Sequence, residues 1–133
     1  MEFIKGKEWL RRARTIDLLI WEKQQEIEAY ESTLACAGVK YDRQNVITSP
    51  QNHFEMVMCD IAECFEQIKK LNETKIIILR EINQKLDSLG ECPERYVLRA
   101  FYVNGLSMSE IAKRINYDEK YCYELRKKGI EAL

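Results

Sequence analysis

Apolar residues recur at alternating intervals of three and four along two long stretches of the chain, the pattern of a coiled-coil seam. The residues between them are mostly Glu, Lys, Gln, Arg and Asn, so each stretch is predicted to form one long amphipathic helix. In the first stretch, up to residue 37, the seam consists of Trp9, Ala13, Ile16, Ile20, Lys23, Ile27, Tyr30 and Leu34. In the second stretch, residues 52–89, it consists of Phe54, Val57, Ile61, Cys64, Ile68, Leu71, Lys75, Ile78, Ile82, Lys85 and Leu89.

The segment between the two stretches, "AGVKYDRQNVITSPQNH", has no helical period and contains Gly38 and Pro50. It predicts a loop at about residues 38–51, longer than most connections within compact domains. The two helices are expected to fold back as a long, coiled-coil-like antiparallel hairpin, or to pair between chains. A single hairpin would leave four large apolar residues without cover, which favours a homo-oligomer: Trp21, Phe65, Leu79 and Leu86.

A different pattern begins at "GECPER", where a helix stop at Gly90 is followed by a proline suited to a first helical turn. A compact apolar helix then ends at Asn104-Gly105. Ser107 and Glu110 have the spacing of a capping box that opens a second helix, and Asp118 is a fitting N-cap for a third. The fold is therefore predicted as all-α, with a helical hairpin at residues 1–89 and a three-helix domain at residues 90–133.

The second and third of these short helices are joined by a tight turn at residues 115–118, which predicts a helix-turn-helix. Ala112 lies where the two helices nearly touch, and a larger side chain there would separate them. Cys122 and Leu125 of the last helix are expected to face a small core with Ile111 and Ile115. The outward side of the last helix would then be free to enter a DNA major groove.

Composition removes other classes of function. The chain has 133 residues, of which 32% are charged and 46% hydrophobic, as in soluble helical proteins. No apolar run approaches the roughly 20 residues that a membrane span needs, and no signal peptide is evident, so a cytoplasmic protein is expected. Neither seam holds a carboxylate pair, a Ser/His arrangement or a Gly-rich phosphate loop, so neither an enzyme nor a small-molecule substrate is predicted.

The five cysteines show no CxxC or CxxH spacing, which predicts reduced thiols rather than a disulfide framework or a zinc site. His53 is the only histidine and is interpreted as a capping or surface residue. Residues 90–133 carry eight Lys/Arg and seven Asp/Glu, a net charge of +1, within a chain of net charge −1. A local cationic face is still expected, because Lys and Arg are concentrated in the last helix.

The stretch from Arg95 to Leu133, which contains "LSMSEIAKRINYDEKYCYELRKKG", resembles the DNA-binding region 4 domain of bacterial sigma factors. The whole chain is similar to phage-encoded transcriptional regulators of the RinA type. The resemblance implies a sigma-type helix-turn-helix and activation of phage gene transcription in a bacterial host cell. It also implies duplex DNA as a partner, host RNA polymerase as a second one, and no cofactor.

Position by position, the resemblance implies base contacts for Glu119, Lys120 and Glu124. It implies phosphate contacts for Tyr121 and Tyr123, where the family usually carries arginine. Lysine can donate a hydrogen bond to guanine and glutamate can accept one from cytosine, so Lys120 and Glu124 are the main candidates for sequence readout. The full candidate set for DNA binding is Ser107, Lys113, Arg114, Glu119, Lys120, Tyr121, Tyr123, Glu124, Lys127 and Lys128.

Two other functions stay open at this point. The near-neutral charge favours a protein-interaction module that binds RNA polymerase or another protein and touches DNA only weakly. A phage packaging component is the third reading, because small terminase subunits also combine a helix-turn-helix with long oligomerising helices. Those proteins usually carry the DNA-binding domain first, whereas here it comes last.

Overall fold

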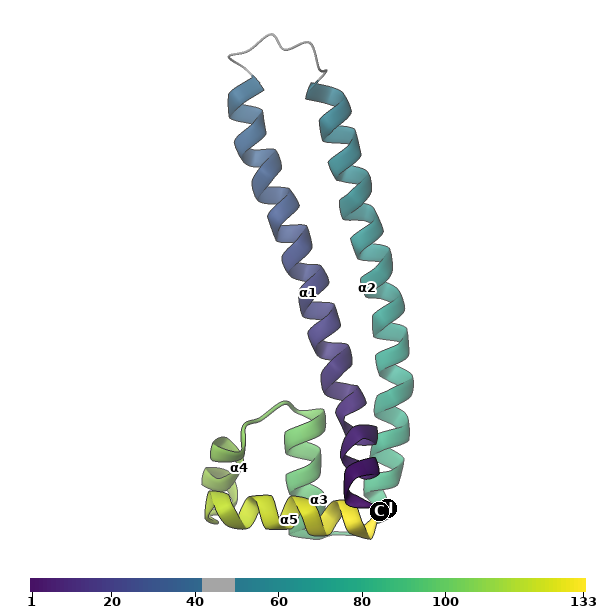
Figure 1. The fold of residues 1–133 in the computed structure, drawn as a ribbon, viewed down its shortest axis with the longest axis vertical. Helices are drawn as coiled ribbons and strands as arrows, with labels where there is room; N and C mark the ends of the chain where they lie inside the picture. The colour runs from purple at the N-terminus through teal and green to yellow at the C-terminus, as the bar shows by residue number, and fades with distance from the viewer. Residues whose placement is uncertain (42–49) are drawn as a thin grey trace. The chain divides into compact units, whose positions relative to one another are not determined.

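The computed structural model describes the backbone of residues 1–41 and 50–133, and the side chains of residues 1–36 and 52–133. Its described part contains helices and no strand, which confirms the all-α prediction (Figure 1). The elements are α1 (Phe3–Tyr41), α2 (Pro50–Asp87), α3 (Pro93–Leu98), the π-helical turn η1 (Arg99–Val103), α4 (Met108–Ile115) and α5 (Glu119–Ala132).

The predicted loop at residues 38–51 is partly wrong. Its central residues, 42–49, lie outside the described part of the chain, but residues 38–41 belong to α1 and residues 50–51 to α2. Gly38 therefore does not end the first helix. Glycine costs a helix interior only about 1 kcal/mol relative to alanine, which flanking helical turns can offset.

The chain divides into two compact units, and the division falls inside both long helices. Unit 1 contains Met1–Asp17 and Thr74–Leu133, and unit 2 contains Leu18–Glu73. The domain boundary predicted between residues 89 and 90 follows the change in sequence pattern and stays a prediction. Each unit is described by itself below.

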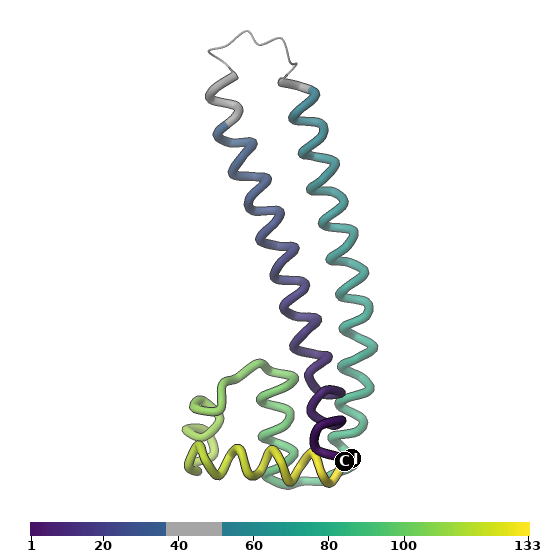
Figure 2. Tube along the Cα trace, in the orientation of Figure 1, coloured from purple at the N-terminus to yellow at the C-terminus, as the bar shows by residue number. Residues whose placement is uncertain are grey.

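In unit 2, α1 and α2 run in opposite directions and share a small apolar core (Figure 2). Ile27 of α1 is buried with Ile61 and Cys64 of α2, and four predicted seam residues pack around them: Tyr30, Leu34, Val57 and Ile68. Trp21 and Phe65 are 58% and 57% exposed, as predicted for apolar residues outside the seam.

In unit 1, the first turns of α1 lie against the last turns of α2. Arg12 bonds Glu81 at 2.8 Å, and the seam residue Lys75 bonds Asp17 at 2.6 Å. Buried seam residues lie between these ion pairs and beyond them: Ala13, Ile16, Ile78 and Ile82. The burial pattern of the two helices therefore follows the predicted seam, although Phe54 and Lys85 are exposed.

One residue predicted to lack cover is fully buried. Leu86 is 0% exposed, and the end of α2 around it also contacts the π-helical turn η1. Arg99 of η1 donates to Asn83, one helical turn before Leu86, at 3.3 Å. It also donates to Asp87, which directly follows Leu86, at 2.7 Å. Leu79 is half-buried. The apolar surface left for self-association is therefore smaller than the sequence suggested.

The helices α3, α4 and α5 and the turn η1 enclose the second apolar core, which belongs entirely to unit 1. Its buried members are Val97, Ala100, Met108, Ile111, Ala112, Cys122 and Leu125. Phe101, Leu106 and Ile115 pack against it from partly exposed positions. The predicted partners of Cys122 and Leu125, Ile111 and Ile115, are both in this set.

Two glycines allow close approaches around α5. A Cβ on Gly129 of α5 would lie 2.8 Å from Leu98 of α3, and a Cβ on Gly6 of α1 would collide with Ile130 of α5. The beginning of α1 therefore lies directly against the end of α5, and the Met1 nitrogen donates to the Glu131 carbonyl at 3.2 Å. Figures 1 and 2 show these two chain ends side by side.

Candidate nucleic-acid interface

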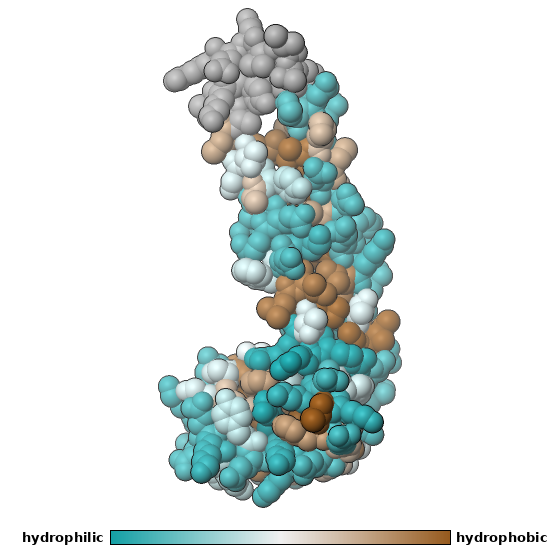
Figure 3. Space-filling model, viewed as in Figure 1, coloured by the Kyte–Doolittle hydropathy of each residue, from teal (hydrophilic) through white to brown (hydrophobic). Residues whose placement is uncertain are grey.

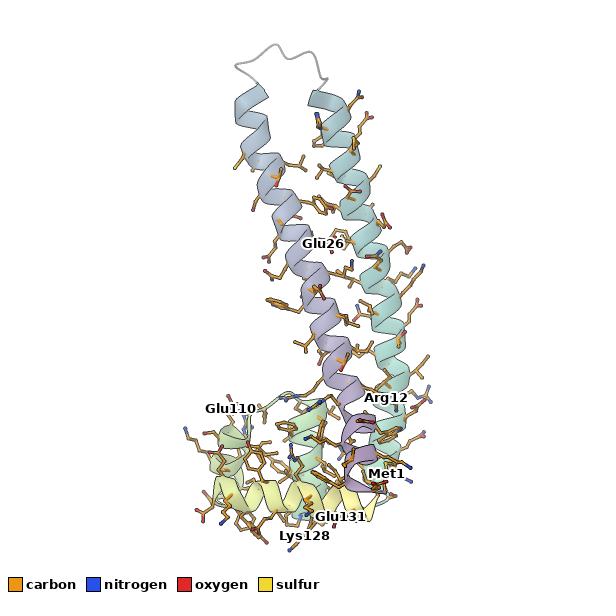
Figure 4. All side chains as sticks on the ribbon, viewed as in Figure 1. Met1, Arg12, Glu26, Glu110, Lys128 and Glu131 are labelled. Carbon is orange, nitrogen blue, oxygen red and sulfur yellow. The ribbon has the colours of Figure 1, made fainter. Side chains whose placement is uncertain are left out.

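The α4 helix begins with the cap that the sequence predicted. Ser107 has extended backbone angles, and its hydroxyl accepts a hydrogen bond from the Glu110 backbone nitrogen at 3.2 Å. This bond satisfies one of the N–H groups that the first turn leaves without a partner. Figure 4 shows Glu110 at the surface of α4.

A left-handed residue makes the turn between α4 and α5. Asn116 has φ 58° and ψ 39°, and it is the only non-glycine residue with positive φ in the described backbone. The Tyr117 nitrogen bonds the Ala112 carbonyl at 3.2 Å, which closes the end of α4. Asp118 occupies the predicted N-cap position of α5, but its side chain makes no capping hydrogen bond.

The α5 helix has one buried face, formed by Cys122, Leu125, Gly129 and Ile130. With 3.6 residues per turn, Lys120, Glu124 and Lys127 lie together on the opposite face. We call these three residues the outward stripe; all of them are exposed. Figure 4 places Lys128 on the side of α5 that points away from α3.

Every residue predicted to bind DNA is exposed, and the set comes from α5, the last turn of α4 and the cap before α4. Lys113 and Arg114 lie in the last turn of α4, where positive charge also stabilises the carbonyl end of a helix. Figure 3 shows a mostly hydrophilic surface over α5, at the bottom of the view. The exposed members are Ser107, Lys113, Arg114, Glu119, Lys120, Tyr121, Tyr123, Glu124, Lys127 and Lys128.

The two tyrosines predicted to contact phosphate have different neighbours. Tyr121 packs edge-on against Tyr117, with ring centroids 4.9 Å apart, and so supports the turn. Tyr123 lies under the guanidinium of Arg126, whose central carbon is 5.2 Å from the ring centroid. Tyr123 therefore brings no charge of its own but holds a cation beside the outward stripe.

Arg126 lies near a second arginine, Arg14, in a cationic group of unit 1 that no pattern in the sequence indicates. Its guanidinium carbon lies 5.7 Å from the Phe101 centroid and 5.9 Å from the Phe3 centroid. The guanidinium of Arg14, from α1, lies 4.0 Å from the same Phe101 ring. Phe101 thus holds one arginine from α1 and one from α5, an arrangement that only the tertiary fold brings together.

Tyr102 lies next to this group and is 2% exposed. Its hydroxyl and the Nε of Arg126 are both buried, and neither makes a hydrogen bond of good geometry among the described residues, although the Arg126 side chain lies close enough to the hydroxyl to lower its pKa as a donor. Burial raises the pKa of the Tyr102 hydroxyl, and the positive charges of Arg126, Arg11 and Arg14 partly oppose that rise. Three guanidinium groups therefore act on one buried hydroxyl.

The described residues contain no group of His, Cys, Asp and Glu side chains that could hold a metal ion. Cys122 is fully buried, and burial raises the pKa of its thiol, while Cys36 and Cys59 are exposed. Within the same residues, no helix is both long and apolar enough to cross a membrane.

Comparison with known proteins finds no matching family model, no matching curated protein and no matching solved structure. The site is therefore interpreted from its own geometry.

Proposed function

We propose that the protein is a transcription regulator that binds duplex DNA through α4 and α5, as the resemblance to RinA-type phage regulators implies. In this proposal α3, α4 and α5 act as a sigma-type helix-turn-helix domain. The long helices α1 and α2 form an antiparallel hairpin that serves self-association or contact with host RNA polymerase. The regulated genes would be phage genes in a bacterial host.

The observation that carries the proposal is the combination of a sharp turn and an exposed helix face after it. The left-handed Asn116 turns the chain directly from α4 into α5, and the small residue Ala112 is buried in the core that α4 and α5 share. The outward stripe of Lys120, Glu124 and Lys127 is left in solvent. The α5 helix has 14 residues and is therefore about 21 Å long, and an α-helix with its side chains is about 10 to 12 Å in diameter, which fits a major groove about 12 Å wide.

Roles within this surface follow from chemistry and position. Lys120 and Glu124, in the first two turns of α5, would read base edges, since lysine donates to guanine and glutamate accepts from cytosine. Lys127, Lys128, Lys113 and Arg114 would contact phosphates, where charge rather than side-chain shape decides affinity.

The test is a binding measurement with the full chain. Duplexes from the region upstream of the neighbouring phage operon and random duplexes of equal length would be titrated at several salt concentrations. We expect the upstream duplex to bind at least tenfold more tightly, and both affinities to fall as salt rises. Equal affinity for the two duplexes would argue against sequence-specific regulation, and no binding at low salt would reject DNA as the partner.

One observation favours a second function. The outward stripe continues to Glu131, so that charges along it alternate in the order Lys120, Glu124, Lys127 and Glu131. Alternating charge fits a polar protein surface better than a phosphate backbone. A module that binds RNA polymerase is therefore the alternative. Binding of the chain to purified host polymerase without DNA, combined with no gel shift on any duplex, would favour it.

A further inference from the structure

In unit 1, Arg14 of α1 and Arg126 of α5 are held against one aromatic ring, and neither has an acidic partner among the described side chains. Arg14 of α1 and Arg126 of α5 both contact Phe101, at 4.0 Å and 5.7 Å from the ring centroid. Neither forms an ion pair with any of the side chains described, whereas the neighbouring Arg12 bonds Glu81 at 2.8 Å. Two like charges brought together without a counter-charge repel each other, so an anion bound between them would be stabilised.

The charges around Tyr102 indicate the same concentration of cations. The charges that act most strongly on its hydroxyl are those of Arg126, Arg11 and Arg14, and all of them lower its pKa against the larger effect of burial. Lys127 and Arg126 also lie 6.0 and 5.9 Å from the Phe3 ring, on the α1 side of α5. Arg11 and Arg14 of α1 and Arg126 and Lys127 of α5 therefore form a cationic group in this part of unit 1.

The contacts with Phe101 leave N–H groups at the edges of the two guanidinium groups available to an anion. A guanidinium that packs on a ring keeps its N–H groups at its edge, where they can make paired hydrogen bonds to two oxygens of a phosphate. The Nε of Arg126 is buried beside the Tyr102 hydroxyl, so the terminal N–H groups of this guanidinium are the ones that would contact an anion. Phe101 also fixes the direction of both side chains, which lowers the entropy lost when an anion binds.

We propose that Arg14 and Arg126 form a binding site for a backbone phosphate of duplex DNA. This inference rests on the proposed function and adds α1 to the DNA-binding surface. Arg126 lies beside Tyr123 and Lys127 on one flank of α5, and Lys128 lies on the other. A helix in the major groove has a sugar-phosphate backbone on each side, so the two flanks contact the two backbones.

The first measurement follows the arginine Nε–H signals of the full chain by NMR while sodium phosphate replaces sodium chloride at constant ionic strength. The Arg14 and Arg126 signals should shift in a saturable way, while that of Arg12, which is held by Glu81, stays in place. The shift at each arginine should be lost when the other is replaced, in Arg14→Gln and Arg126→Gln. No shift at either arginine overturns the inference.

The second measurement compares random duplex DNA binding by Arg14→Gln, Arg126→Gln and the control Arg12→Gln. Loss of one phosphate contact reduces the slope of log affinity against log salt by about 0.9, so the first two variants should show this change and Arg12→Gln should not. Arg14→Lys should keep the slope but bind phosphate more weakly, because the paired hydrogen bonds are lost. If Arg126→Gln does not fold, the slope of Arg14→Gln against that of Arg12→Gln decides the inference, and equal slopes overturn it.

The outcomes separate the two proposals. A chain that binds duplex DNA with unchanged slope in Arg14→Gln and Arg126→Gln overturns the phosphate site and leaves the proposed function intact. A chain whose arginines respond to phosphate but which binds no duplex overturns both the proposed function and the assignment of the phosphate to DNA.

Discussion

Replacement of Gly129 by alanine sets two effects of opposite sign against each other. Gly129 lies inside α5, where alanine is favoured over glycine by about 1 kcal/mol of helix propensity. Its Cβ, however, would lie 2.8 Å from Leu98 Cδ1 and 3.2 Å from Glu94 Cβ. Carbon atoms in contact prefer about 3.5 to 4.0 Å, and Leu98 is fully buried, so it cannot swing into solvent.

The expected result follows from the two magnitudes. Overpacking a filled core typically costs about 1 to 3 kcal/mol, so after the propensity gain we expect Gly129→Ala to lower the free energy of unfolding by about 1 kcal/mol. Urea unfolding followed by circular dichroism measures this difference. Glu131→Ala, on the exposed side of α5, is the matched control and should change stability by less than about 0.5 kcal/mol. A more stable Gly129→Ala would show that α5 does not approach α3 this closely.

Three further predictions concern other parts of the molecule. Lys120→Ala should weaken specific DNA binding by about 1 to 3 kcal/mol and random binding far less, whereas Lys127→Ala should weaken both alike; equal losses for Lys120→Ala would assign it to phosphate. Ile78→Ala should cost roughly 2 to 5 kcal/mol of unfolding free energy, and an unmoved melting curve would contradict the seam. Iodoacetamide at pH 8 should modify the exposed Cys59 and spare Cys122, whose pKa is raised by burial, until the protein unfolds; equal rates would contradict its burial.

The sequence predicted those features of the fold that depend only on residues close together in the chain. Three such features are each determined by residues a few positions apart: the cap at Ser107, the helix end at Gly105 with its φ of 72°, and the turn before Asp118. The alternating spacing also identified most buried positions of the two long helices, because a helical period maps directly onto a face. The end of the first helix was placed too early, since Gly38 is a weak signal on its own.

What the sequence did not predict depends on contacts between distant segments. Leu10 is fully buried and Leu86 is covered, although neither spacing indicated it, because unit 1 joins residues from both ends of the chain. The cationic group around Phe101 was missed for the same reason. Arg14 and Arg126 are far apart in sequence, and nothing in either local pattern indicates that both contact the same ring.

The make-up of the two units has a consequence for the order of folding during synthesis. Unit 2 is a single continuous segment, Leu18–Glu73, whereas unit 1 is assembled from Met1–Asp17 and Thr74–Leu133. Residues 1–17 are synthesised long before their partners at the end of α2 and in α5, so the apolar turns around Leu10 are only partly covered until the last helix is made. Contacts of such long sequence separation form slowly. We therefore expect a nascent chain that stops before α5 to retain the unit 2 pairing and to be prone to aggregation through its first turns.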